Sequence, residues 1–130
     1  MSQTAITFAI SDLAKEFGIT PRTIRFWEDQ GLLFPHREGQ TRVFSRRDRT
    51  RLKLALRGKR LGLSLAEIKD LIGMYASTED ETPQLLECLR IMEKRRAALE
   101  QQREDIEAML AEITQFEAQC QLELARRDAA

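Results

Sequence analysis

Apolar residues recur at helical spacing in two short stretches near the start of the chain. On the first stretch they are Leu13, Ala14 and Phe17. We expect Ser11 to cap that helix and Gly18 to end it. Thr20 and Pro21 then open a second helix that stops at Gly31. Two short helices joined by a glycine-containing turn predict a helix-turn-helix unit, with an ordinary helical hairpin as the alternative.

The second helix is followed by two apolar runs that flank a polar turn with Gly39 at its tip. The runs Leu32–Phe34 and Arg42–Phe44 are expected to pair as a β-hairpin about that turn. A further brief strand is expected at Phe8–Ile10. We interpret the hairpin as the candidate wing of a winged helix-turn-helix domain.

Two capping-box patterns predict the next two helices. Ser45 with Asp48 opens a third helix that Gly62 ends, and Ser64 with Glu67 opens a fourth. The residues expected to face inward are Leu52, Ala55 and Leu56 on the third helix and Leu65, Ile68, Leu71, Ile72 and Tyr75 on the fourth. We therefore predict a winged helix-turn-helix domain over residues 1–76 and a polar, acidic linker over residues 77–82.

Pro83 opens a segment that runs to about Arg127 with no further proline and no glycine, which predicts one helix of about 44 residues and about 66 Å. One position of a seven-residue repeat holds Leu85, Met92, Leu99, Ile106, Ile113 and Cys120. A second position holds Leu89, Arg96, Arg103, Leu110, Glu117 and Leu124. These heptads predict a coiled coil with a second copy of the chain. An antiparallel pair sets Arg96 near Glu117 of the other copy, so residues 83–130 are predicted to be an antiparallel dimerisation helix with a short tail, in a protein that is mainly α.

A net charge of zero would by itself argue against binding to nucleic acid, but the distribution of charge along the chain reverses that conclusion. The formal net charge is zero at pH 7, but residues up to Leu63 hold 13 Lys/Arg against 6 Asp/Glu, a charge of +7, and the remainder hold 8 against 15. A basic half joined to an acidic half is typical of a nucleic-acid reader with an appended module. No apolar run reaches the length of a membrane span, so we expect a cytoplasmic protein that does not bind membranes.

The basic half offers three groups of candidate contacts with double-stranded DNA. Arginine suits guanine edges in the major groove, and threonine suits base edges or thymine methyl groups. Cations on the wing and on the third helix suit phosphates and the minor groove. The predicted contacts are Thr20, Arg22, Thr23, Arg25 and Phe26 on the second helix, Arg37, Thr41 and Arg42 on the wing, and Arg57, Lys59 and Arg60 on the third helix, which carries eight cations and one acid between Arg46 and Arg60.

An ordered series of motifs over residues 8–76 resembles the MerR-type transcription regulators. The motifs are Ile10-Ser11-Asp12-Leu13-Ala14, Gly18-Ile19-Thr20, Thr23-Ile24-Arg25-Phe26-Trp27-Glu28, Gly31-Leu32-Leu33, Arg42-Val43-Phe44-Ser45 and Leu61-Gly62-Leu63-Ser64-Leu65-Ala66-Glu67-Ile68. The resemblance implies an antiparallel homodimer that binds palindromic promoters with an over-long spacer and distorts the DNA for RNA polymerase when an effector is present. The chain has Phe26-Trp27 where two tyrosines are usual, and Gln40-Thr41-Arg42 where Gly-Tyr-Arg is usual. A hydroxyl contact to phosphate at Phe26 is therefore absent.

Within that family the chain is similar to the Liu-type branch. The similarity rests on Gly39-Gln40, Arg51-Leu52-Lys53-Leu54, Arg57-Gly58-Lys59-Arg60-Leu61-Gly62 and Arg95-Arg96-Ala97-Ala98-Leu99-Glu100-Gln101-Gln102. It implies control of genes for leucine and isovalerate breakdown, with an acyl-CoA or a branched-chain catabolite as the small-molecule effector. Such an effector is expected near the dimer helix, the linker or the tail.

Other functions fit parts of the sequence less well. Metal-sensing relatives carry a cysteine at the start of the dimer helix and a close thiol pair after it, whereas here Cys88 lies within the coil and Cys120 at a seam position. In an antiparallel pair the two thiols would approach within a turn or two, which would give a redox or soft-metal switch. An architectural DNA-bending protein without an effector is a further alternative. An enzyme is not expected, and neither is a cofactor or a metal site, because the chain has one histidine and no nucleophile motif or phosphate loop.

Overall fold

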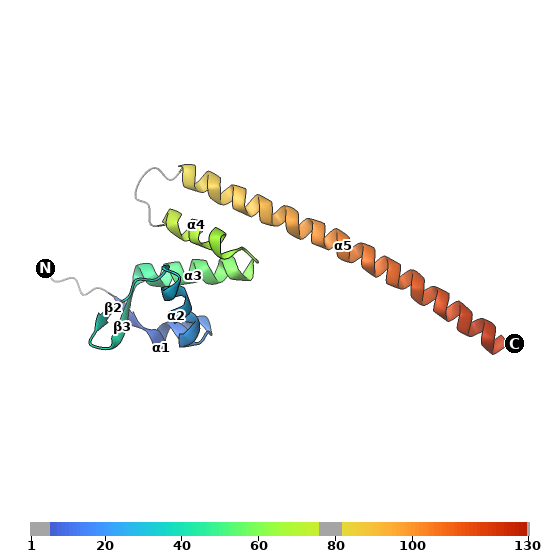
Figure 1. Ribbon diagram of the computed structural model, residues 1–130, viewed down its shortest axis with the longest axis horizontal. Helices are drawn as coiled ribbons and strands as arrows, with labels where there is room; N and C mark the ends of the chain where they lie inside the picture. The colour runs from blue at the N-terminus through green and yellow to red at the C-terminus, as the bar shows by residue number, and fades with distance from the viewer. Residues whose placement is uncertain (1–5, 76–81, 130) are drawn as a thin grey trace. The chain divides into compact units, whose positions relative to one another are not determined.

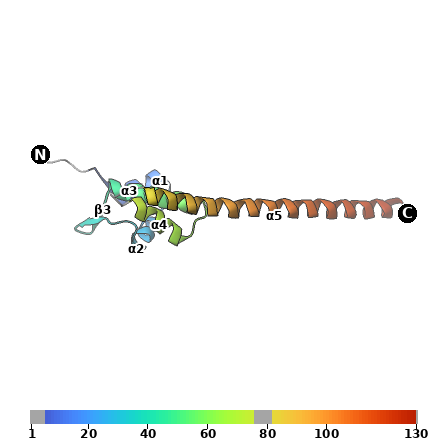
Figure 2. The same cartoon turned by 90° about the horizontal axis from the view of Figure 1, so that it is seen from above.

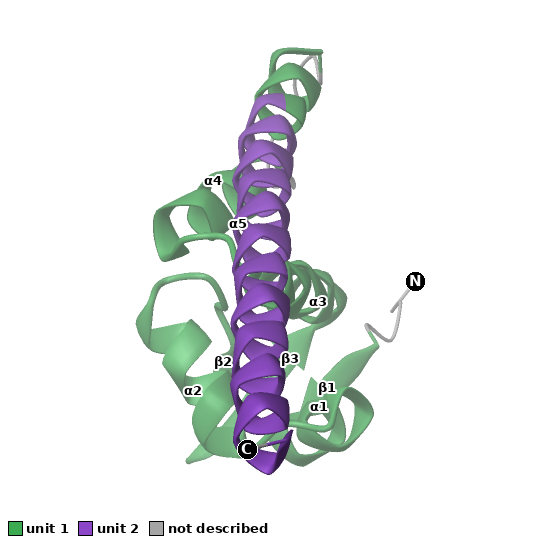
Figure 3. Ribbon diagram, turned by 90° about the vertical axis from the view of Figure 1, so that its right-hand side faces the viewer, with its two compact units in different colours: residues 1–89 green, residues 90–130 purple. Residues whose placement is uncertain are grey.

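The computed structural model describes residues 6–75 and 82–129, and the chain divides into two compact units, residues 1–89 and 90–130 (Figure 3). The first unit holds, in chain order, β1 (Thr7–Ala9), α1 (Ile10–Phe17), α2 (Pro21–Asp29), β2 (His36–Glu38), β3 (Thr41–Ser45), α3 (Arg46–Arg60), α4 (Leu65–Tyr75) and the start of α5 (Thr82–Ala129) (Figure 1). The second unit is the remainder of α5. The predicted fold class, a helix-turn-helix domain followed by a long C-terminal helix, is confirmed.

The prediction that Ser11 caps α1 is wrong, because the strand before it leads directly into the helix. The N-cap is Ala9, which still pairs with Val43 in the sheet and therefore has an extended backbone. The carboxylate of Asp12 accepts a hydrogen bond from the backbone N–H of Ala9 at 2.9 Å, which is the half of a capping box that satisfies the N-cap residue itself. Ala9 has no side-chain oxygen that could accept from the first turn of α1. Gly18 ends α1 as predicted, with a φ of +64° that other residues rarely adopt.

The wing hairpin forms with a different first arm from the one predicted. β3 is the central strand of a three-stranded antiparallel sheet of order β1-β3-β2, in which Arg37 pairs with Arg42 and Phe8 with Phe44. Leu32–Phe34 is not a strand. Leu32 and Leu33 are both buried, and successive side chains of a strand would point to opposite faces. The run belongs to the core, and the polar residues His36–Glu38 supply the arm.

The core of the first unit lies among the helices and the sheet: α1 and α3 contact the sheet, α2 packs against α1 and α3, and α4 packs against α3. Its fully buried apolar side chains include Leu13, Ile24, Leu33, Phe44 and Leu52. α3 and α4 approach closely at Gly58, since a Cβ built there would lie 2.8 Å from Cγ1 of Ile68. Ala55, Ile68 and Ile72 are buried as predicted, but Leu65 is 37% exposed because it lies in the first turn of α4.

α5 is a single helix of 48 residues, about 72 Å long, and begins at Thr82, one residue before the predicted start (Figure 2). The remainder of the predicted linker lies outside the described residues, so the boundary at 76 stays a prediction. Every residue from Arg96 to Ala129 is exposed. Within the described ranges, no helix has the length and apolar character needed to cross a membrane.

Candidate nucleic-acid interface

The exposed side of α2 carries three of the side chains predicted to read DNA. Arg22, Arg25 and Phe26 are three and four residues apart, so they share one side of the helix, and all three are exposed. The opposite side packs into the domain through Ile24 and Trp27, both buried. α2 can therefore present these side chains to a DNA groove while its other side remains in the core.

The aromatic pair at the centre of α2 combines an exposed ring with a buried one. Phe26 is 45% exposed and Trp27 only 2%. The two ring centroids lie 5.1 Å apart with an interplanar angle of 72°, an edge-to-face arrangement. Trp27 Nε1 is buried without a hydrogen-bond acceptor in the described structure, so this ring is held by packing alone.

The two threonines at the start of α2 form its N-cap. The backbone N–H of Thr23 donates to Thr20 Oγ1 at 3.2 Å, and the two hydroxyl oxygens lie 3.1 Å apart. Thr20 is exposed and Thr23 is half-buried. Helix N-termini direct N–H groups and positive potential at anions, which suits a phosphate. A DNA contact by either threonine stays a prediction.

Arg42 connects the wing to α2. Arg37 and Thr41 of the wing are exposed, whereas the Arg42 side chain is half-buried. Its Nε donates to Oε1 of Glu28 at 2.9 Å, a contact between residues 14 positions apart. The pair ties β3 to the helix that carries Arg25. A DNA contact by Arg42 therefore has to use its other guanidinium nitrogens.

The eight cations of α3 differ in their surroundings. Arg49 binds Glu16 of α1, with Nε donating to Oε1 at 2.9 Å and Nη2 donating to Oε2. This hydrogen bond lowers the pKa of Glu16 below its usual value of 4.5 and raises that of Arg49. The guanidinium carbon also lies about 6 Å from the ring centres of Phe8 and Phe17, which favours a cation–π interaction. Arg49 therefore serves the domain's own structure.

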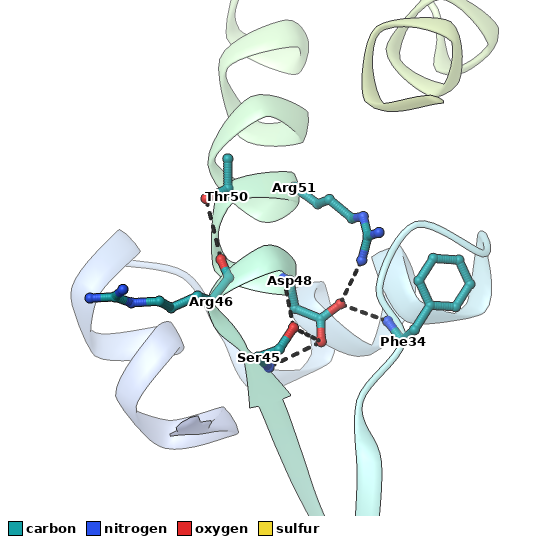
Figure 4. Close-up of polar contacts among 6 residues, drawn as sticks. All are labelled: Phe34, Ser45, Arg46, Asp48, Thr50 and Arg51. Carbon is teal, nitrogen blue, oxygen red and sulfur yellow. Dashed lines mark hydrogen bonds and ion pairs between the residues drawn. The ribbon is translucent and has the colours of Figure 1, made fainter. Parts of the chain in front are cut away.

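Asp48 is a fully buried carboxylate that joins three segments of the domain (Figure 4). Its Oδ1 accepts from the backbone N–H of Phe34 at 2.8 Å and from Nη1 of Arg51 at 3.4 Å. Its Oδ2 accepts from both the backbone N–H and the hydroxyl of Ser45, which confirms the predicted capping box. The Arg51 guanidinium lies 5.1 Å from the ring centre of Phe34. The chain between α2 and the wing is thereby fixed to the start of α3.

The remaining predicted phosphate contacts lie at the end of α3. Arg57, Lys59 and Arg60 are exposed, in the last turns of the helix. Cations in that position also interact favourably with the carbonyl end of the helix dipole. Sequence reasoning missed the link from Asp48 to Phe34, the Arg49–Glu16 pair and the Arg42–Glu28 pair, since no local spacing connects residues so far apart in the chain.

The residues predicted to form the dimer seam lie along α5. Leu85, Leu89, Leu99, Ile106, Leu110, Ile113 and Cys120 are exposed, and Met92 is half-buried. Ile91, one position before Met92, is buried. Cys88 is half-buried and belongs to the first unit, whereas Cys120 belongs to the second. Over the described ranges, His, Cys, Asp and Glu side chains form no group of three or more suited to a metal ion.

Family models match most of the chain. A model described as MerR HTH family regulatory protein matches residues 8–74, and one described as MerR, DNA binding, matches residues 49–116. The transcriptional regulator ZntR of Escherichia coli K12 is 28% identical over 117 residues, which are 88% of this chain and 76% of ZntR. The regulator CueR of Salmonella typhi is 28% identical over 106 residues, 77% of each chain.

Solved structures share the fold. One is HiNmlR, described as a MerR family regulator lacking the sensor domain, bound to promoter DNA. It has a TM-score of 0.52 and 26% identity, over 85% of this chain and 78% of that one. A MerR family regulator from Bacillus cereus has a TM-score of 0.63 and 27% identity, over 82% and 76%.

Proposed function

The chain belongs to the MerR family of helix-turn-helix regulatory proteins, which are DNA-binding transcriptional regulators, and on this premise we propose that it acts as a homodimer on a palindromic promoter site. The observation that carries the proposal is the exposed side of α2. It presents Arg22, Arg25 and Phe26 beside a wing that Arg42 ties to the same helix. HiNmlR, a structural neighbour of the same family that is bound to promoter DNA, supports the proposed binding to a promoter.

The proposed contacts divide into two kinds. Arg22 and Arg25 read base edges in the major groove, where arginine pairs bidentately with guanine. The exposed cations Arg57, Lys59 and Arg60 of α3, with Arg37 of the wing, bind phosphates and set affinity through counterion release. Arg49 and Arg51 are not proposed as contacts, since they bind Glu16 and Asp48.

Homodimerisation is proposed from the exposed seam of α5. A single helix cannot cover its own apolar side, and Leu99, Ile106 and Ile113 repeat every seven residues along it. Pairing with the same face of a second copy would bury this row as a coiled coil. The antiparallel orientation is favoured because it sets Arg96 near Glu117, whereas a parallel pair would set like charges together.

We further propose that the dimer distorts an over-long promoter spacer so that RNA polymerase can engage both promoter elements. The segment Arg57–Gly62 resembles the Liu-type branch, which makes acyl-CoA esters and branched-chain catabolites the first effectors to test. A second candidate is regulation without an effector. It is favoured by the structural neighbour HiNmlR, a MerR family regulator lacking the sensor domain.

The test is a footprint of the purified chain on the promoter region flanking its own gene, with and without acyl-CoA esters. A protected palindrome across an over-long spacer is expected, and a change on adding an ester would identify the effector class. Arg25→Ala should lose this protection and Gln115→Ala, on the exposed surface of α5, should keep it. Protection without a palindrome or a response to esters would favour an effector-independent DNA-bending protein.

A further inference from the structure

Phe26 is an exposed aromatic side chain on the side of α2 that also carries Arg22 and Arg25. We propose that its ring contacts the 5-methyl group of a thymine in the major groove, and so sets base specificity. The proposal rests on the DNA-binding function argued above, and goes beyond it by assigning a base type to one residue. It places a thymine within the stretch of DNA that Arg22 and Arg25 read.

Phe26 lies beside the two arginines that are proposed to read base edges. It lies four residues after Arg22 and next to Arg25, on the same exposed side. A recognition helix inserts that side into the groove, and the charge of +7 on the first 63 residues favours the approach of DNA. An apolar ring on such a side has no favourable contact with phosphate oxygens.

The chemistry of base edges then selects the partner. In the major groove, adenine, guanine and cytosine present hydrogen-bond donors and acceptors, whereas thymine also presents a methyl group. The ring of Phe26 has no hydroxyl with which to meet donors or acceptors. The thymine methyl is therefore the base-edge feature that the ring can contact without leaving a polar group unpaired.

The packing of Phe26 favours this contact. Its edge-to-face contact with Trp27 restricts the ring, and Trp27 itself is almost completely buried. A ring that such a contact restrains loses less conformational freedom on meeting the methyl group than a ring without one. Insertion of an apolar wedge between base steps is typical of minor-groove proteins and does not fit a recognition helix in the major groove.

The experiment replaces thymine by deoxyuridine, which removes only the 5-methyl group. A duplex bound by the full chain is first selected from a random-sequence library, and each thymine of the selected site is then replaced singly. With the natural chain, one thymine position in each half-site should show about fourfold weaker binding, the effect of one buried methyl group. With Phe26→Ala, binding should be weaker overall, and the same replacement should have no further effect.

Phe34→Ala is the matched control, because Phe34 is an exposed phenylalanine of the same unit that lies outside α2. This variant should retain the fourfold dependence on the methyl group. Persistence of that dependence in Phe26→Ala, or its absence in the natural chain, would overturn the inference and leave the proposed function standing. If the library yields no preferred sequence at all, both the inference and the proposed function are wrong.

Discussion

The two compact units of this chain are stabilised in different ways. The helix-turn-helix unit buries its own apolar side chains, from Leu13 in α1 to Ile72 in α4, around a three-stranded sheet. From Arg96 onward α5 buries none, although Leu99, Ile106 and Ile113 recur along it. The first unit therefore carries its core internally, whereas the apolar row of α5 would be buried only in the proposed dimer.

The polar contacts of the two units also differ, in the distance along the chain between the residues that they join. In the first unit they join distant segments, as in Arg42 with Glu28 and Arg49 with Glu16. In α5 the pairs Gln101 with Asp105 and Arg126 with Glu123 are local, four and three residues apart. Local pairs of this kind stabilise a helix by about 0.2–0.5 kcal/mol each and do not specify its partner. The long-range pairs fix how the segments of the first unit lie relative to one another.

The largest expected effect comes from placing a charge in the proposed seam. Leu99→Asp should dissociate the dimer, because each buried carboxylate costs on the order of several kcal/mol, about a thousandfold in association. The first unit should stay folded, since none of its core residues changes. Sedimentation velocity measures the dimer and the emission of Trp27, the single tryptophan, reports on the first unit.

The control for that variant is Gln115→Asp, which adds the same charge at an exposed position outside the heptad seam. It should remain dimeric. A Leu99→Asp protein that still sedimented as a dimer would contradict the proposed coiled coil.

The complementary variant is Asp48→Ala, which should destabilise the first unit and leave assembly through α5 intact. It leaves the Phe34 N–H unsatisfied and the Arg51 charge unpaired, a cost of about 3–5 kcal/mol in the free energy of unfolding. Urea unfolding followed by Trp27 emission measures the loss.

Asp12→Ala is the comparison for Asp48→Ala, because it removes an exposed carboxylate that caps only Ala9. It should cost about 1 kcal/mol or less. If the two variants lost the same free energy of unfolding, the contacts of Asp48 with Phe34 and Arg51 would contribute nothing beyond those of an exposed cap.

A smaller effect, confined to DNA binding, is expected for Arg25→Ala. Affinity for the specific site should fall by about 1–3 kcal/mol, with neither dimerisation nor stability changed. Lys59→Ala should instead weaken binding to all sequences equally and reduce the salt dependence by about one charge. Titrations on specific and random duplexes at two salt concentrations distinguish them. If Arg25→Ala weakens binding equally on both duplexes, then Arg25 contacts only phosphate.

The smallest effect is the pH dependence of the Glu16–Arg49 pair. Because Arg49 holds the pKa of Glu16 below 4.5, the carboxylate stabilises the fold at pH values above 4.5. That contribution is lost as the pH falls from 4.5 through the lowered pKa. Glu16→Gln should therefore lower the urea midpoint at neutral pH, and the two proteins should converge in acid.

High salt should reduce the difference in urea midpoint between the natural chain and Glu16→Gln, since the Glu16–Arg49 pair is exposed to solvent. The comparison is Glu104→Gln on the exposed surface of α5, which should leave the Trp27 transition unchanged at every pH. If the difference in urea midpoint between the natural chain and Glu16→Gln grew in acid, the pH dependence would be opposite to the one expected for this pair.

Features that depend on a few neighbouring residues could be predicted from the sequence. The Thr20 cap of α2, the Ser45–Asp48 capping box and the uninterrupted α5 all follow from spacings of three, four or seven residues. The cap of α1 was not predictable in this way. Its position depends on Ala9 pairing with Val43, which is distant in the chain and adjacent only in the sheet.

The same distinction holds for the candidate site. The basic character of the first half, the exposed face of α2 and the heptads of α5 follow from the sequence by itself, because they are properties of composition and of local periodicity. The tertiary structure decided which cations serve the fold and which stay exposed, and that Leu32 and Leu33 enter the core instead of a strand. Those outcomes depend on which distant groups the folded chain brings within contact distance, as Phe34 and Asp48 are, and sequence spacing carries no information about that distance.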